Sequence, residues 1–171
     1  KKENKMGLRG SDTATLHFDN VRVSNDQMLG PEGEGFKQFM KTLDAGRISI
    51  GAMALGLAQG AYEIAVRYAQ TRSQFGVPIA EHQAIQFKLA DMATKIEAAR
   101  HLVYHSAYLK DHDQPFAKQS AMAKLYASEV GRYSTYQAIQ VLGGAGYMTA
   151  NRVERHFRDV KLCEIGEGTS E

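Results

Sequence analysis

Residues 36–68 read FKQFMKTLDAGRISIGAMALGLAQGAYEIAVRY, and their apolar side chains recur every three or four positions. The stripe consists of Phe36, Phe39, Met40, Leu43, Ile50, Met53, Leu57, Ala61, Ile64 and Tyr68. This is the spacing of one face of an α-helix, so it predicts a long first helix. Small residues between Gly51 and Gly60 would let neighbouring helices approach closely.

Two further long helices are predicted downstream. A second stripe advances in alternating steps of four and three and should be buried along its whole length: Ile85, Leu89, Met92, Ile96, Ala99 and Val103. Asp113-Gln114-Pro115 offers capping and first-turn chemistry for a third helix, which runs to Leu142 and ends at Gly143-Gly144. A short helix is predicted over 153–157, and Gly168-Thr169 has the pattern of another helix start. Short connections between these segments indicate an antiparallel bundle.

The sequence before Gly35 has a different pattern. From Thr13 to Val23 apolar and polar residues alternate, which predicts half-buried β structure. Turn-forming residues then concentrate between Met28 and Gly35. We therefore predict a β segment over 1–34 followed by a helical bundle over 35–171.

Length and charge exclude several classes of protein. A chain of 171 residues can bury roughly 70% of its unfolded surface, so it needs no disulfide or metal to fold. Its 21 basic and 19 acidic residues are dispersed, which gives no nucleic-acid footprint. The single Cys fits a reducing compartment, and no apolar run reaches the roughly 20 residues of a membrane span. We expect a soluble protein without nucleic acid or membrane span.

Several motifs have simpler structural explanations. His101 and His105 are one helical turn apart, but the Glu of a zinc-protease motif is absent, so no metal site is predicted. The basic residues Arg152, Arg155, Arg158 and Lys161 form a solvated face, with anion binding as a secondary reading. Cys163 has no nearby His and is interpreted as a packing residue.

Three carboxylates near the C-terminus leave two readings open. Glu164, Glu167 and Glu171 lie beside Gly166 and Gly168, where glycines allow sharp turns and the close approach of a ligand. A carboxylate in this setting is a candidate general base. The alternative is that these acids interact with the dipole of a helix start.

Five segments, taken together, resemble the acyl-CoA dehydrogenase family. They are LDAGR (43–47), RSQFG (72–76), EHQ (81–83), QVLGG (140–144) and GEGTSE (166–171), in the family's order and at its intervals. The resemblance also covers Gly7–Ser11 and Leu29–Gly35, which match the end of the family's middle β-domain. It implies a mainly α fold: an antiparallel four-helix-bundle type C-terminal domain, lacking its last helix, preceded by a short β remnant of the middle domain.

The resemblance further implies an FAD-dependent reaction on an acyl-CoA thioester. In the family a Glu removes an α-proton while the β-hydride passes to flavin N5, and the product is a trans-2-enoyl-CoA. Glu167 matches that base. In the isovaleryl-type branch the base lies instead on the first helix, at the position of Gly46, which cannot act as one.

Other roles follow from the same resemblance. Substrate-side positions match Asp44, Arg47 and Gly168, although Asp44 and Arg47 also fit a buried salt bridge. Cofactor positions match Arg72, Gln74, Phe75, Gln83, Gln140, Val141, Leu142, Gly143, Gly144, Thr169, Ser170 and Glu171. Because the family's Arg at position 72 reaches the FAD of a neighbouring subunit, a homo-oligomer, usually a tetramer, is implied.

Partners, substrate and location are expected along the same lines. An electron-transferring flavoprotein would accept the electrons, the location would be cytoplasmic in bacteria or the mitochondrial matrix in eukaryotes, and this chain alone should be inactive or nearly so. Gly166 replaces the Tyr that many members have, which favours short or branched acyl chains. An acyl-CoA oxidase-type flavoenzyme and a non-catalytic helical scaffold are the alternatives.

Overall fold

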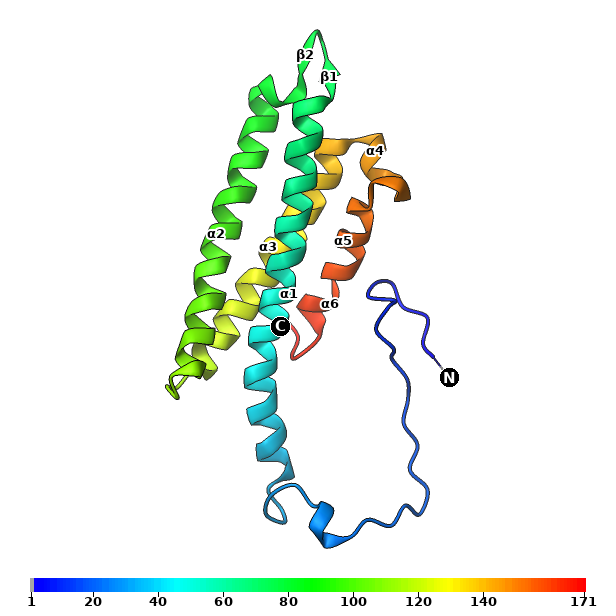
Figure 1. Cartoon of the computed structure of the whole chain (residues 1–171), viewed down its shortest axis with the longest axis vertical. Coiled ribbons are helices and arrows are strands. Elements are labelled where there is room, and N and C mark those ends of the chain that lie inside the picture. Colours follow the sequence, from blue (N-terminus) through cyan, green and yellow to red (C-terminus); the bar gives the residue numbers. More distant parts are fainter. Residues whose placement is uncertain (1) are drawn as a thin grey trace.

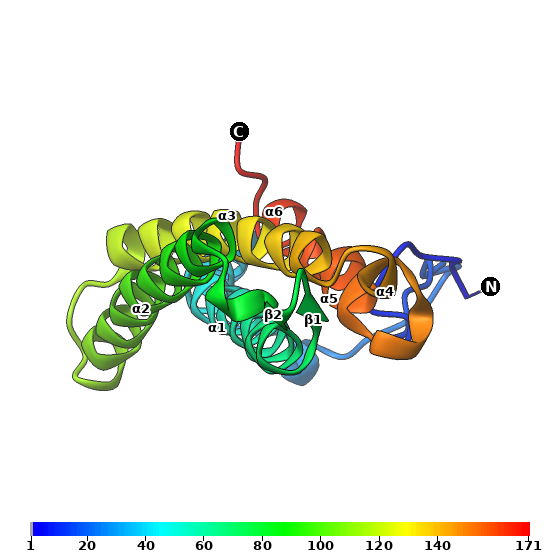
Figure 2. The ribbon, with the colours of Figure 1, turned by 90° about the horizontal axis from the view of Figure 1, so that it is seen from above.

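Three long helices dominate the computed structural model, which describes residues 2–171. In helices α1 (Gly35–Thr71), α2 (Gln83–Asp111) and α3 (Ala117–Leu142) the chain reverses direction twice, so α2 runs antiparallel to both α1 and α3 (Figure 1). Three short helices follow: α4 (Gly144–Tyr147), α5 (Val153–Val160) and α6 (Leu162–Ile165). The 3-10 turns are η1 (Asn25–Gln27), η2 (Ile79–Glu81) and η3 (Thr149–Asn151), and the strands β1 (Ser73–Gln74) and β2 (Val77–Pro78) form a hairpin. Helix α5 packs on α1 and α3 in the fourth position, so the predicted bundle is confirmed (Figure 2).

Small residues bring the helices close together. Helix α1 presents a row of fully buried alanines: Ala54, Ala58, Ala61, Ala65 and Ala69. Opposite them, Gly131 of α3 is so crowded that a Cβ atom there would lie 2.6 Å from a methyl of Val160 and 3.3 Å from the Ala54 carbonyl oxygen. Three helices meet at this point because none of them carries a bulky side chain there.

The apolar stripes are buried over only part of their length. On α2, Met92, Ile96, Ala99 and Val103 are buried as predicted. Ile85 and Leu89 are only partly buried, which corrects the expectation for the start of that helix. The first turns of α1 extend beyond the other helices (Figure 1), and Phe36, Phe39 and Met40 are exposed there.

The turn between α2 and α3 corrects a second prediction. Asp113 adopts a positive φ of 53°, and the Gln114 N–H donates to the Leu109 carbonyl oxygen at 2.9 Å. This is the pattern that closes the C-terminus of a helix. Asp113-Gln114-Pro115 therefore ends α2, and α3 begins later, at Ala117, after Phe116 without a side-chain cap.

The β structure predicted between Thr13 and Val23 does not form. Within residues 2–34 there is a single β-bridge, between Lys2 and Ala14, and Leu16, Phe18, Val21 and Val23 are exposed. An extended segment needs a neighbouring strand to satisfy its backbone groups, and the described part of the chain offers none. The division into 1–34 and 35–171 stays a prediction, although α1 begins at Gly35.

The N-terminal segment touches the bundle at one place. The Leu8 N–H donates to Asp159 Oδ1 at 2.6 Å, and the Arg158 guanidinium donates to the Met6 carbonyl oxygen at 2.9 Å. A Cβ atom at Gly7 would lie 2.6 Å from the Arg158 carbonyl oxygen. Glycine at this position therefore lets the chain lie directly against α5.

Helix α1 is the one helix within residues 2–171 that is long and apolar enough to cross a membrane. Core helices of soluble bundles have the same length and composition, and α1 packs its alanine row against its neighbours. The expectation of no membrane span stays a prediction.

Candidate functional site

A cleft of about 270 Å³ opens where the C-terminal segment crosses α1 and α3. Its walls are Arg47, Ala121, Lys124, Leu125 and residues 167–171. We call it the Glu167 cleft. The structure thus brings together the predicted base Glu167, the predicted substrate residues Arg47 and Gly168, and the predicted cofactor residues Thr169, Ser170 and Glu171.

The backbone of this segment is unusual at two successive residues. Glu167 has a φ of 56° and Gly168 a φ of 102°. Positive φ is uncommon for a residue with a side chain, and such strain is found most often at functional sites. Glycine at position 168 makes the second turn possible, because a φ of 102° suits no other residue. The Glu167 side chain is half-buried and lines the cleft.

Gly46 lies directly beneath the Glu167 carboxylate. A Cβ atom built at Gly46 would lie 2.8 Å from the Glu167 carboxyl carbon and closer still to Oε2. Positions 46 and 167, which match the two places where different branches of the acyl-CoA dehydrogenase family carry the base, are therefore neighbours in space. Only one of them holds a carboxylate in this chain, and the missing side chain at the other leaves it room.

Asp44 and Arg47 form an ion pair on α1. The Arg47 guanidinium donates to Asp44 Oδ1 at 2.8 Å, and each side chain is about 30% exposed. This is the salt bridge that the sequence offers as the alternative to a substrate-binding role for the two residues. Arg47 nevertheless lines the Glu167 cleft, so its guanidinium is available to a ligand on its other side.

Lys124 is a residue of this cleft that the sequence analysis missed. It is only 4% exposed, and its ammonium donates a hydrogen bond to the carbonyl oxygen of Gly168. Burial lowers the pKa of Lys124, since leaving water disfavours the charged form. The sequence offers no sufficient signal for it: Lys124 lies four residues from each of Ser120 and Ser128, but only the structure shows that these serines are buried.

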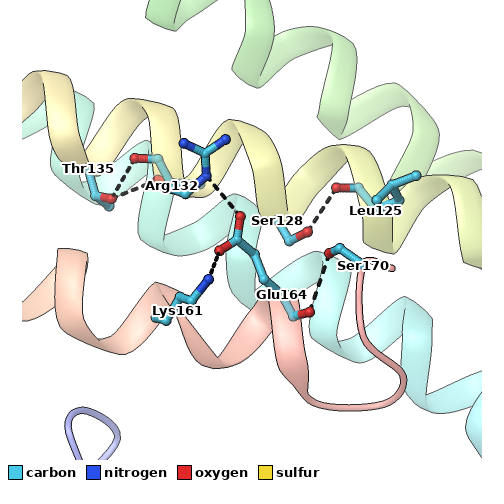
Figure 3. Close-up of polar contacts among 8 residues, drawn as sticks. Leu125, Ser128, Arg132, Thr135, Lys161, Glu164 and Ser170 are labelled. Atoms are coloured by element: carbon cyan, nitrogen blue, oxygen red, sulfur yellow. Dashed lines mark hydrogen bonds and ion pairs between the residues drawn. The ribbon is translucent and has the colours of Figure 1, made fainter.

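Glu164 fastens the helix that leads into the cleft. Its carboxylate accepts from Arg132 Nε of α3 at 2.9 Å and from Lys161 Nζ at 2.6 Å (Figure 3). The Glu164 carbonyl oxygen accepts from the Ser170 N–H at 3.0 Å, and the Ser170 hydroxyl lies 3.3 Å away. Glu164 therefore acts as a structural anchor that closes the loop over Glu167.

Replacing this anchor should reduce stability in a pH-dependent way. Burial raises the pKa of Glu164, but hydrogen bonds from Lys161 and Arg132 outweigh it and hold the pKa below its usual range. The stabilisation is therefore present above the unfolded value of about 4.3 and is lost as the pH falls through the lower folded value. We expect Glu164→Gln to cost about 1–2 kcal/mol at pH 7 in urea unfolding. A difference from wild type that persisted undiminished at pH 3 would contradict this.

A second, larger cleft of about 590 Å³ lies at the far end of the bundle, between the β1–β2 hairpin and the end of α3. We call it the hairpin cleft. Of the predicted cofactor residues it is lined by Arg72, Gln74, Phe75, Val141, Leu142, Gly143 and Gly144. Gln83 and Gln140 are exposed and are not part of its wall, and Thr169, Ser170 and Glu171 lie in the Glu167 cleft. Arg47 and Arg72 are about 37 Å apart along α1.

The hairpin cleft has features that fit a polar ligand. Phe75 and Gly76 form the two-residue turn of the hairpin, both with positive φ, and Phe75 is 94% exposed. The His82 Nε2 atom is buried without a hydrogen-bond partner within the described residues, and sequence analysis did not assign it. Gly143 and Gly144 would meet no atom within 4 Å if they carried a Cβ, so a ligand can approach their backbone.

Three further motifs of the sequence lie outside the two clefts. Residues 2–171 contain no group of three or more metal-ligating side chains. Of the basic run, Arg158 pairs with Glu154 at 2.7 Å and Lys161 with Glu164 at 2.6 Å, whereas Arg152 and Arg155 are exposed. Cys163 is fully buried, and burial raises its pKa to about 11, so its thiol is inert at neutral pH.

Comparison with known proteins covers the whole chain. The profile of "Acyl-CoA dehydrogenase, C-terminal domain" matches residues 33–171. Over 167 residues the chain is 56% identical to "Probable acyl-CoA dehydrogenase YngJ" of Bacillus subtilis, covering 98% of this chain and 44% of that protein. It is 54% identical over its full length to the human mitochondrial short-chain specific acyl-CoA dehydrogenase, of which it covers 42%.

A solved structure agrees with these relatives. Butyryl-CoA dehydrogenase from Megasphaera elsdenii superposes with a TM-score of 0.98 at 49% identity, over 99% of this chain and 44% of that one. The chain thus spans less than half the length of the relatives it matches.

Proposed function

Because this chain belongs to the acyl-CoA dehydrogenase family, we propose that it is the C-terminal part of an enzyme that oxidises the Cα–Cβ bond of an acyl-CoA thioester to a trans-2-enoyl-CoA. The observation that carries the proposal is the placement of Glu167. Its carboxylate lines a cleft, above a glycine that leaves it space, on a backbone held in a strained conformation. Within residues 2–171 no other carboxylate combines these features with a match to the family's base.

Glu167 acts in this proposal as the general base that removes the α-proton. A carboxylate can do so when it is held within reach of the proton and when developing charge on the thioester oxygen is stabilised. The backbone N–H of Glu167 is the donor in this chain that would bind that oxygen. Arg47, which lines the same cleft, and the absent side chain of Gly168 shape the space for the thioester.

The residues of the hairpin cleft fit a flavin dinucleotide. Arg72 offers a planar guanidinium that can bind phosphate oxygens, and Gly143 and Gly144 allow the cofactor to lie against the backbone. The buried His82 Nε2, which has no partner among the described residues, can form a hydrogen bond with a polar group of the cofactor. Thr169, Ser170 and Glu171 would make further contacts from the Glu167 cleft. When bound, FAD supplies the acceptor for the substrate's β-hydride.

The distance between the two clefts supports a homo-oligomer. Predicted cofactor residues occur in both clefts, and Arg47 of one cleft is about 37 Å along α1 from Arg72 of the other, which is the arrangement expected when each copy contributes to two cofactors. A tetramer is the form that the family resemblance implies. An electron-transferring flavoprotein would be the electron acceptor, and the enzyme would work in the bacterial cytoplasm or the mitochondrial matrix, as the bacterial and mitochondrial relatives suggest.

Short acyl chains are the proposed substrates. Gly166 has an ordinary φ of −71°, and a Cβ there would make only normal contacts with Leu162, the shortest of 3.4 Å. Neither backbone nor packing requires glycine, so the missing side chain is available to shape a substrate pocket. The names of the human and Megasphaera relatives, short-chain specific and butyryl-CoA dehydrogenase, support the same choice.

Anaerobic reduction of the full-length flavoenzyme tests the proposal. Acyl-CoA thioesters of increasing length and branching are mixed with it, and flavin bleaching is followed by stopped flow. We expect butyryl-CoA to reduce the flavin faster than long-chain thioesters do. Absence of reduction by every thioester would refute the function. Rapid reoxidation of the reduced, product-bound enzyme by O₂ would identify an oxidase instead.

A further inference from the structure

Lys124 is a buried cation whose place in the bundle is unexplained by packing. It lies on the inner face of α3, in a row with Ser120 and Ser128, and is 4% exposed. Among the described residues no carboxylate lies within ion-pair distance of its ammonium. Removing an ammonium from water is unfavourable, and an apolar side chain of similar size would suit a helix bundle better.

The contact that Lys124 makes is with the cleft. Its ammonium donates to the carbonyl oxygen of Gly168, the residue that follows the proposed base. The carbonyl group of Gly168 is fixed by this bond just after the two residues with positive φ. A charge-assisted hydrogen bond is strong enough to hold a conformation that the chain would otherwise leave.

The other end of the same loop is held separately. Glu164 is tied to Arg132 and Lys161, and the Ser170 N–H returns to the Glu164 carbonyl oxygen (Figure 3). Those contacts close the loop onto α6 and anchor it to the side of α3. Lys124 supplies the contact that ties Gly168 to α3, and Arg47 lies on the same cleft, with its Nη2 atom 4.0 Å from where a Cβ of Gly168 would be.

We propose that Lys124 is a positioning residue: its hydrogen bond to the Gly168 carbonyl oxygen sets the turn that holds the Glu167 carboxylate over Gly46. This rests on the proposed role of Glu167 as the base. The role assigned to Lys124 is positional and not proton transfer, because the hydrogen bond of its ammonium goes to a backbone carbonyl oxygen. Its loss should therefore slow proton abstraction and leave substrate binding and the bundle largely intact.

Lys124→Met in the full-length, FAD-loaded enzyme tests this inference. Methionine has nearly the same length and no donor, so the melting temperature should stay the same or rise. We expect anaerobic flavin reduction by butyryl-CoA to slow by about 10- to 100-fold, since a small misplacement of a reacting group has an effect of this size. The dissociation constant of butyryl-CoA should hardly change, and an α-deuterated substrate should show a larger isotope effect than with wild type.

Two variants complete the experiment. Lys118→Met changes an exposed lysine on the same helix, and butyryl-CoA should reduce the flavin of this variant at the wild-type rate. Lys124→Arg keeps a cation with N–H donors and should recover part of the lost rate. If Lys124→Met does not fold, Lys124→Leu replaces it, because leucine is also apolar and has no donor for the Gly168 carbonyl oxygen, and the same loss of reduction rate is expected.

The outcomes separate this inference from the proposed function. A folded Lys124→Met or Lys124→Leu enzyme with the wild-type reduction rate would overturn the positioning role and leave the dehydrogenase proposal standing. A lower melting temperature with an unchanged rate would also overturn it, because Lys124 would then support only the bundle. A wild-type enzyme that no acyl-CoA reduces would overturn both.

Discussion

Glu167→Gln is expected to slow flavin reduction by butyryl-CoA on the order of 10⁴-fold in the full-length enzyme. The amide has the shape of the carboxylate and keeps the left-handed turn, but it cannot accept the α-proton. Binding should survive, because the Glu167 N–H that is proposed to hold the thioester oxygen belongs to the backbone. Stopped-flow reduction and a butyryl-CoA titration of the oxidised flavin measure the two effects separately.

Two controls sharpen this result. Glu63→Gln alters an exposed carboxylate on α1, remote from both clefts, and should react like wild type. Glu167→Asp keeps a base on a shorter side chain, so its rate should fall between those of wild type and Glu167→Gln. If Glu167→Gln reduced its flavin at more than a tenth of the wild-type rate, another group would have to be the base.

Periodic patterns predicted the helices well because burial repeats with the helix itself. The long stripe before Tyr68 became α1, and Gly143, with a φ of 59°, ends α3 as expected. The same patterns do not show how far a neighbouring helix extends. Phe36 and Phe39 therefore belong to the stripe and are exposed, since no described element packs against the first turns of α1.

The prediction for the turn between α2 and α3 is wrong because the same motif can end one helix or begin the next. Asp113-Gln114-Pro115 is suited both to ending a helix and to beginning the next, and the left-handed φ at Asp113 decided for the former. The alternation from Thr13 to Val23 is a property of strands that have partners. It could not reveal that residues 2–34 provide only one bridge.

The candidate site was predictable to the extent that it lies in contiguous motifs. Glu167 and Gly168 came from one segment and Arg47 from another, and the structure joins them in one cleft. What escaped prediction depends on contacts between distant segments. Lys124 and Gly168 are joined by a hydrogen bond although they are 44 residues apart in the sequence. The role of His82 depends on a buried ring nitrogen without a partner among the described residues, which cannot be recognised from sequence.

Gly46→Val should slow flavin reduction by about 10²- to 10³-fold while leaving the protein folded. A first carbon at this position already meets the carboxyl carbon of Glu167 at 2.8 Å, and the two methyl groups of valine extend further into the same space. The flexible end of the Glu167 side chain gives way more easily than helix α1, so the base is displaced while the bundle is preserved. A crystal structure of the variant would show the carboxylate moved away from α1.

The same substitution at Gly56 provides the matched control. Gly56 lies on the same helix, and a Cβ there would meet nothing within 4 Å, so Gly56→Val tests the effect of valine on α1 alone. Equal rates in Gly46→Val and wild type would mean that the carboxylate does not work from its place above Gly46. A loss of rate equal in both variants would assign the effect to the helix. Only a loss confined to Gly46→Val shows that the empty position on α1 is what allows Glu167 to act as the base.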